Sequence, residues 1–60
     1  MPVITLEAAR LSKEQKQQLA KEFTASAARI MEMPEDAFYV FLKENPLDNV
    51  GVGGKLLSDK

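Results

Sequence analysis

The chain contains no cysteine, no histidine and no tryptophan among its 60 residues. Without cysteine it can form no disulfide, and without cysteine or histidine a structural zinc site is nearly excluded. The same absences remove the Ser-His triad, the thiolate nucleophile and the imidazole base from the list of catalytic groups. We therefore expect no metal site and no cofactor, and any proton transfer must use a less common base.

Strong charge of one sign and long apolar runs are also missing. The net charge is −1 and the pI is near 5.3, which argues against a nucleic-acid-binding surface, since such surfaces are basic. The longest apolar run, Ala37 to Leu42, is far too short to span a membrane. Glu7 and Arg10 interrupt the apolar residues that a signal peptide needs. We expect no nucleic-acid partner, no membrane partner and a cytoplasmic location.

The length predicts one small domain, residues 1–60, that depends on other subunits. A chain of this size buries only about 60% of its unfolded surface, and its core rarely supplies more than about 3–5 kcal/mol. Yet 45% of the residues are hydrophobic. Because disulfides and zinc are excluded, oligomerisation is the remaining means of stabilisation.

The first half of the chain predicts a strand followed by a long helix. Val3 to Glu7 is short and rich in β-branched residues, as strands are. Ser12 and Gln15 have the spacing of a capping box, in which each side chain bonds the backbone of the other. Pro34 disfavours helical geometry in the residue before it, so the helix should end near Met33. Spacings of three and four define an apolar stripe on this helix: Leu19, Phe23, Ala27, Ile30 and Met31.

The second half predicts another strand and a small hairpin. Ala37 to Lys43 reads as a strand with Phe38, Val40 and Leu42 on one face and Tyr39, Phe41 and Lys43 on the other. Both faces are largely apolar, so one should pack on the helix and the other on a second subunit. A strand-helix-strand order favours a parallel pair with a right-handed crossover. Glycines at 51, 53 and 54 predict a tight turn or hairpin. The expected class is α+β, a β-α-β protomer with a C-terminal hairpin.

Pro2 is the candidate base. It becomes the N-terminus if Met1 is removed, and its nitrogen is then a secondary amine. An α-amino group titrates near ~7.7–8.0, and burial or a nearby positive charge favours its neutral form, which can accept a proton. The simplest alternative is an ordinary Met-Pro start without any function.

Several pieces together carry a resemblance to one family. Pro2 precedes a short strand, Arg10 precedes Glu14-Gln15-Lys16 and the long helix, and Pro34 introduces the second strand. The tail reads Asn49-Val50-Gly51-Val52-Gly53-Gly54. In this order, the pieces resemble the small-subunit tautomerases related to 4-oxalocrotonate (2-hydroxymuconate) tautomerase. The resemblance implies a hexameric, barrel-like assembly and a place in the degradation of aromatic compounds. It also implies an amino-terminal proline that moves a proton in an enol or dienol acid.

The resemblance makes Pro2 the general base and Arg10 the group that binds a substrate carboxylate. Arg10 lies one residue further from the Glu-Gln-Lys run than in the usual pattern. Tyr39 stands where well-known members have a strand arginine from a neighbouring subunit, and Val50 stands where they have an aromatic residue. We therefore expect Arg10, Tyr39 and Val50 to contact the substrate, but losing an arginine clamp is not a conservative change. A different enol acid, or weak promiscuous activity, fits as well as the namesake's dicarboxylate.

Two functions follow from these observations. In the first, the chain is a keto-enol tautomerase acting on a small anionic enol or keto acid, such as a 2-hydroxymuconate-like compound. In the second, it is an oligomer of the same fold with weak activity and a mainly binding or structural role. Met1 separates them, because with Met1 attached the Pro2 nitrogen is an amide without a basic lone pair.

Overall fold

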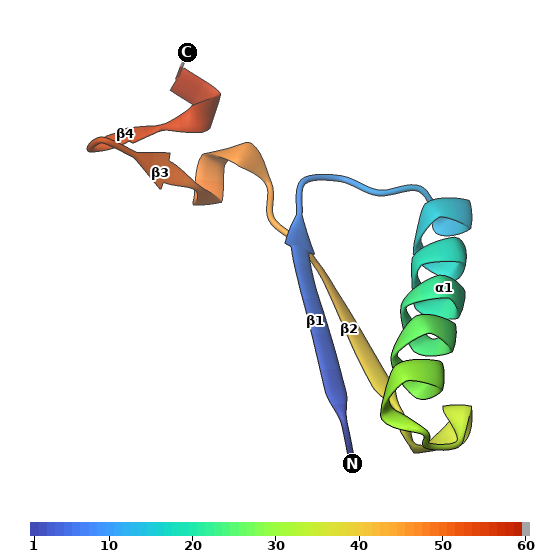
Figure 1. The fold of residues 1–60 in the computed structure, drawn as a ribbon. Coiled ribbons are helices and arrows are strands. Elements are labelled where there is room, and N and C mark those ends of the chain that lie inside the picture. Colours follow the sequence, from blue (N-terminus) through green and yellow to red (C-terminus); the bar gives the residue numbers. More distant parts are fainter. Residues whose placement is uncertain (60) are drawn as a thin grey trace.

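The computed structural model describes residues 1–59, and Lys60, the end of the expected domain, lies outside the described residues. Figure 1 shows a strand, a long helix, a second strand and a small terminal hairpin. The strands and helix are β1 (Val3–Ala8), α1 (Lys13–Met31), β2 (Tyr39–Glu44), β3 (Gly51–Val52) and β4 (Lys55–Leu56). Three short 3₁₀ turns are η1 (Glu35–Ala37), η2 (Leu47–Asn49) and η3 (Leu57–Asp59). The expected α+β class and β-α-β order are confirmed.

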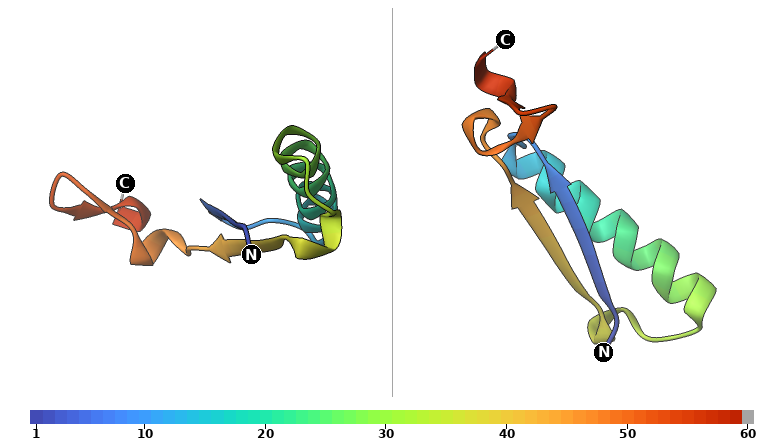
Figure 2. Two further views of the ribbon diagram at one scale, coloured as in Figure 1. Left: turned by 60° about the horizontal axis from the view of Figure 1, so that its bottom comes forward. Right: turned by 90° about the vertical axis from the view of Figure 1, so that its left-hand side faces the viewer.

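β1 and β2 form a parallel pair, and α1 covers one face of it. The register runs from Val3 opposite Tyr39 to Ala8 opposite Glu44. Exposure alternates along β1 and along β2 as far as Lys43, because successive side chains of a strand point to opposite faces. The left view in Figure 2 shows the helix on one side of the sheet and nothing on the other. The predicted faces of the second strand are therefore confirmed: Val40 and Leu42 point toward the helix, and Tyr39 and Phe41 point away from it.

The start of α1 follows local rules, and its end comes earlier than predicted. Ser12 Oγ accepts from the Gln15 backbone at 3.1 Å, and the Gln15 side chain accepts from the Ser12 backbone at 2.9 Å, so the capping box is present. The helix ends at Met31, two residues before the predicted end near Met33, because Glu32 adopts the left-handed conformation with φ of 56°. The backbone N–H of Met33 then bonds the carbonyl of Ala28 at 3.1 Å and closes the last turn.

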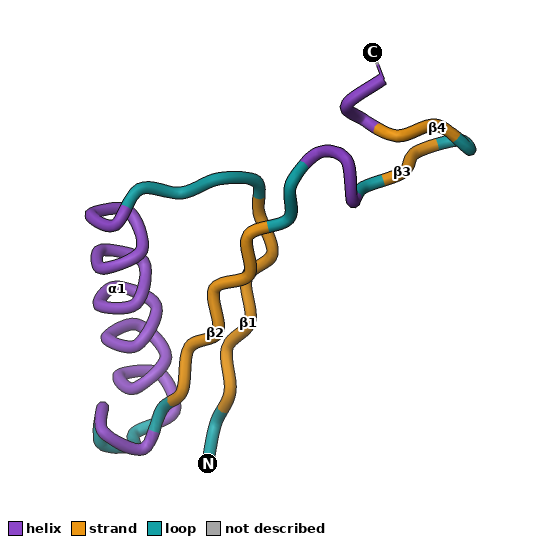
Figure 3. Tube along the Cα trace, turned by 180° about the vertical axis from the view of Figure 1, so that it is seen from behind, coloured by secondary structure: helices purple, strands orange, loops and turns teal. Residues whose placement is uncertain are grey.

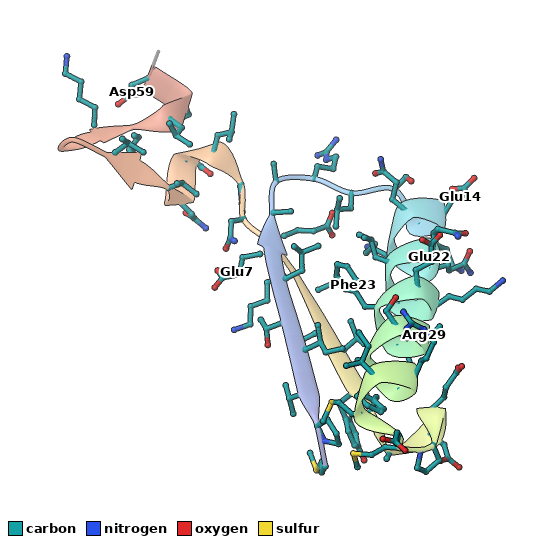
Figure 4. All side chains as sticks on the ribbon, viewed as in Figure 1. Glu7, Glu14, Glu22, Phe23, Arg29 and Asp59 are labelled. Atoms are coloured by element: carbon teal, nitrogen blue, oxygen red, sulfur yellow. The ribbon has the colours of Figure 1, made fainter. Side chains whose placement is uncertain are left out.

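The apolar stripe of α1 packs only along part of its length. Phe23 lies between the helix and the sheet in Figure 4, whereas Glu14 points away from the sheet. Among the described residues only Ala28, 7% exposed, is buried. Ile30 and Met31, which belong to the predicted stripe, are 69% and 50% exposed. A sheet of two strands is too narrow to cover the whole stripe, so its last members remain open within one chain.

β2 starts two residues later than predicted, at Tyr39 instead of Ala37. The backbone N–H groups of Ala37 and Phe38 bond the carbonyls of Pro34 and Glu35, both at 3.1 Å. These bonds form η1 and remove Ala37 from the strand. Pro34, whose carbonyl accepts the first of these bonds, thus begins a turn before the sheet.

The C-terminal arm, residues 47–59, extends away from the β-α-β unit, as Figure 3 shows from behind. Its hairpin turns at Gly53 and Gly54, whose φ angles of 62° and 86° favour glycine. The radius of gyration is 14.8 Å, against roughly 10 Å for a compact chain of this length. One chain therefore does not enclose a sealed core. Within residues 1–59, the structure has no helix that is both long enough and apolar enough to cross a membrane.

Candidate functional site

Pro2 and Tyr39 lie side by side at the end of the sheet where both strands begin. The Tyr39 backbone N–H donates to the Pro2 carbonyl at 3.1 Å, which extends the β1–β2 ladder by one bond. Pro2 is half-buried, and Tyr39 is 51% exposed on the sheet face away from the helix. The encoded chain has Met1 before Pro2, and the Pro2 nitrogen becomes a secondary amine only once Met1 is removed. Both are predicted site residues, and within one chain they are neighbours through this backbone bond.

Arg10 lies at the other end of β1. The strand has six residues, which span about 20 Å at the usual rise, and Arg10 follows two residues beyond its end. An arginine side chain does not cover that separation. Within one chain, Arg10 therefore cannot contact a small substrate bound at Pro2, and it is too distant to lower the pKa of a Pro2 amine.

Arg10 instead lines a shallow depression of about 260 Å³ together with Glu44, Asn45 and Pro46. Glu44 Oε1 accepts from the Leu11 backbone N–H at 2.7 Å, and Glu44 Oε2 lies 3.2 Å from Lys16 Nζ. The Leu11 N–H, then Lys16 and Arg10, hold the pKa of the Glu44 carboxyl below its ordinary value. Arg10 itself makes no ion pair or side-chain hydrogen bond with residues 1–59. Its guanidinium is exposed and open to an anion.

Val50 belongs to a third location, the C-terminal arm. It lies between η2 and β3, and its carbonyl accepts from the Leu57 backbone N–H at 2.8 Å. Its side chain is half-buried, while Val52 in the adjoining strand is exposed. The structure therefore brings together Pro2 and Tyr39, and leaves Arg10 and Val50 apart from them in a single chain.

Glu44 is the residue that sequence reasoning missed. Its carboxylate accepts a hydrogen bond from a backbone group 33 residues earlier in the chain. No local spacing signals such a contact, because it depends on how β2 pairs with β1. In the part of the chain from Met1 to Asp59, no group of three acidic residues is arranged to hold a metal ion.

Comparisons with known proteins agree on one group. Residues 2–60 match the family model described as tautomerase enzyme. A probable tautomerase of Bacillus cereus is 38% identical over 61 residues, covering 100% of both chains. The crystal structure of a 4-oxalocrotonate tautomerase homologue superposes with a TM-score of 0.91 at 31% identity, covering 100% of this chain and 97% of that one. A heterohexamer 4-oxalocrotonate tautomerase of Chloroflexus aurantiacus has a TM-score of 0.73 at 31% identity, covering 97% and 92%.

Proposed function

The chain belongs to the tautomerase family, and from that premise we propose that it is a keto-enol tautomerase with the Pro2 amine as its base. The substrate is a small enol or dienol carboxylic acid of the 2-hydroxymuconate kind. The observation that supports this most is the position of Pro2, half-buried at the sheet end beside Tyr39. The chain has no histidine or cysteine, so it offers no other base suited to neutral pH.

The proposed reaction moves one proton. The neutral Pro2 amine takes the proton of the enol hydroxyl. The O–H electron pair forms the carbonyl, and the electrons of the enol C=C bond move to the carbon atom that will be protonated. The protonated amine then returns the proton to that carbon, which regenerates the base. Only a chain from which Met1 has been removed can do this, because an amide nitrogen does not accept the proton.

Tyr39 and Arg10 are proposed to hold the substrate. The Tyr39 hydroxyl would donate to the oxygen on which charge accumulates in the dienolate-like transition state. Arg10 would bind the substrate carboxylate through charge-assisted hydrogen bonds. Since Arg10 lies beyond the far end of β1 from Pro2, it must come from another subunit. Val50 would supply an apolar wall from the arm.

The site therefore requires an assembly, and we propose a homohexamer. Support comes from the uncovered sheet face, the extended arm and the single buried residue among those described. The similar Chloroflexus protein is a heterohexamer, which is consistent with six subunits in this fold.

A second function is favoured by one feature of the sequence, Tyr39 at the position where the best-known members of the family carry a strand arginine. If Met1 is retained, the protein is an oligomer of the tautomerase fold with weak activity and a binding or structural role. The amide nitrogen of Pro2 then contributes no base, and the substitution of Tyr39 for a strand arginine leaves a weaker carboxylate clamp.

One experiment separates the two functions. Protein purified without a tag is divided into Met1-containing and Met1-free material, with intact mass as the measure, and each is assayed for ketonisation of 2-hydroxymuconate. We expect activity to follow the Met1-free fraction. Equal activity in fully Met1-retaining protein would refute the Pro2 mechanism.

A further inference from the structure

Glu44 joins three segments at the end of the sheet near Arg10. It is the last residue of β2, and its Oε1 accepts from the backbone of Leu11 at 2.7 Å, immediately after Arg10. The adjoining Asn45 donates its backbone N–H to the carbonyl of Ala8 at 2.8 Å. The connection that carries Arg10, residues 9–12, is thus held at both ends by the end of β2. A rigidly held connection fixes the direction in which the Arg10 side chain leaves the backbone.

The second oxygen of Glu44 is occupied by Lys16. The Oε2–Nζ distance is 3.2 Å, and both side chains are partly exposed. Arg10 and Glu44 line the same depression, yet no ion pair joins them in the described chain. The three charges sum to one positive charge, and that charge lies on the free Arg10. Without Lys16, the freed carboxylate oxygen would attract the guanidinium, since arginine and carboxylate pair readily.

We propose that Glu44 is a positioning residue for Arg10: one oxygen holds the 9–12 connection while Lys16 occupies the other, leaving the guanidinium free for an anionic substrate. The inference rests on the proposed role of Arg10 as the group that binds the substrate carboxylate. It assigns to Lys16 a role in keeping Glu44 from competing with that substrate.

The test compares variants whose charge and hydrogen-bonding effects point in opposite directions. Glu44→Ala removes the acceptor for the Leu11 N–H, whereas Glu44→Gln keeps an acceptor oxygen; both remove one negative charge. If Glu44 acted only through its charge, both variants would lower KM for an anionic enol acid. We expect Glu44→Ala to raise KM about tenfold, the value of one hydrogen bond to a charged group. Glu44→Gln should have a KM at or below that of the wild type, with kcat within twofold for both.

Lys16 has a matched control in Lys13, which lies in the same first turn of α1, is exposed and makes no ion pair among residues 1–59. Lys16→Met and Lys13→Met remove the same charge. We expect a severalfold rise in KM for Lys16→Met and little change for Lys13→Met. Exposed ion pairs contribute little to stability, so Lys16→Met should keep the fold and remains informative if Glu44→Ala does not fold.

Arg10→Ala, measured in the same assay, separates failure of this inference from failure of the proposed function. A loss of kcat/KM of about 30-fold or more is expected for a truncated charge pair. An unchanged value would remove Arg10 from the site and the basis of the inference with it. If Arg10→Ala is impaired but Glu44→Ala does not raise KM, or Lys16→Met matches Lys13→Met, the positioning role is wrong.

Discussion

The Pro2 nitrogen is the single atom on which the proposed chemistry depends. Pro2→Ala leaves a primary amine at nearly the same position once Met1 is removed, so it should retain a measurable part of the rate. We expect a loss of about 10- to 100-fold, because general base catalysis commonly contributes about 10²–10⁴-fold and a primary amine keeps some of it. The kcat/KM of the wild type should rise with pH through the amine pKa and then level off.

This result is checked by stopped-flow assays across pH, with intact mass confirming removal of Met1 in both proteins. A flat pH profile in the wild type would contradict a titrating amine. Equal rates for the Pro2→Ala protein and buffer alone would show that the proline ring itself is required.

Tyr39 tests whether the phenol takes part in catalysis or only in packing. Its ring is half exposed on the open sheet face, and its backbone bonds Pro2, so Tyr39→Phe removes one oxygen without altering either feature. If the hydroxyl donates to the developing oxyanion, kcat should fall about 100-fold, the usual effect of losing one such donor. The oligomer should stay intact in sedimentation. An unchanged kcat would leave Tyr39 with packing alone.

The connection between β1 and α1 is the element whose stability should respond to acid. The pKa of Glu44 is lowered in the folded protein by the Leu11 N–H and by Lys16, from an ordinary value of 4.5. A lowered folded-state pKa gives stability that is fully present above the unfolded value and is lost as pH falls through the folded value. The free energy of unfolding of the wild type should therefore exceed that of Glu44→Gln by more at pH 7 than at pH 3.

Denaturant melts of the two proteins at both pH values measure this difference. Glu35→Gln, which removes the same charge from an exposed carboxylate without an ion pair or side-chain hydrogen bond among residues 1–59, is the matched control. A constant difference between wild type and Glu44→Gln across this pH range would show that the charge of Glu44 contributes nothing to folding.

At the scale of the whole molecule, the open sheet face and the arm leave apolar side chains exposed, and the proposed assembly would cover them. Phe41, 47% exposed, lies centrally on that face, opposite Thr5 of β1. Burying a phenylalanine contributes about 1.5–3 kcal/mol, so Phe41→Glu should weaken the assembly by at least that amount per subunit. Gln17→Glu, on the exposed part of α1, adds the same charge and should assemble as the wild type does.

Analytical ultracentrifugation over a range of concentrations distinguishes these cases. We expect six subunits for wild type and Gln17→Glu, and smaller or unfolded species for Phe41→Glu. A well-folded wild-type monomer at micromolar concentration would contradict the dependence on other subunits.

Most of the fold could be predicted from local patterns. The capping box at Ser12 and Gln15 depends on bonds within four residues, and the alternation in β2 depends on the geometry of a single strand. The mistakes lie where neighbouring segments compete. Glu32 closes α1 before Met33, and the turn of η1 takes Ala37 out of the strand. Periodicity also placed Ile30 in the packed stripe, although the narrow sheet does not reach it.

For the candidate site, too, some residues could be selected from the sequence, whereas their arrangement depends on the fold. The lack of histidine and cysteine leaves the Pro2 amine as the candidate base, whereas the choice of Arg10 as an anion ligand depended on the resemblance to the tautomerases. Chain folding settles that Tyr39 lies beside Pro2, that Arg10 lies beyond the opposite end of β1, and that Glu44 holds the connection next to it. Tyr39 and Pro2, and likewise Glu44 and Leu11, are 33 or more positions apart in the chain. Their proximity depends on the parallel register of β1 and β2, which no short segment encodes.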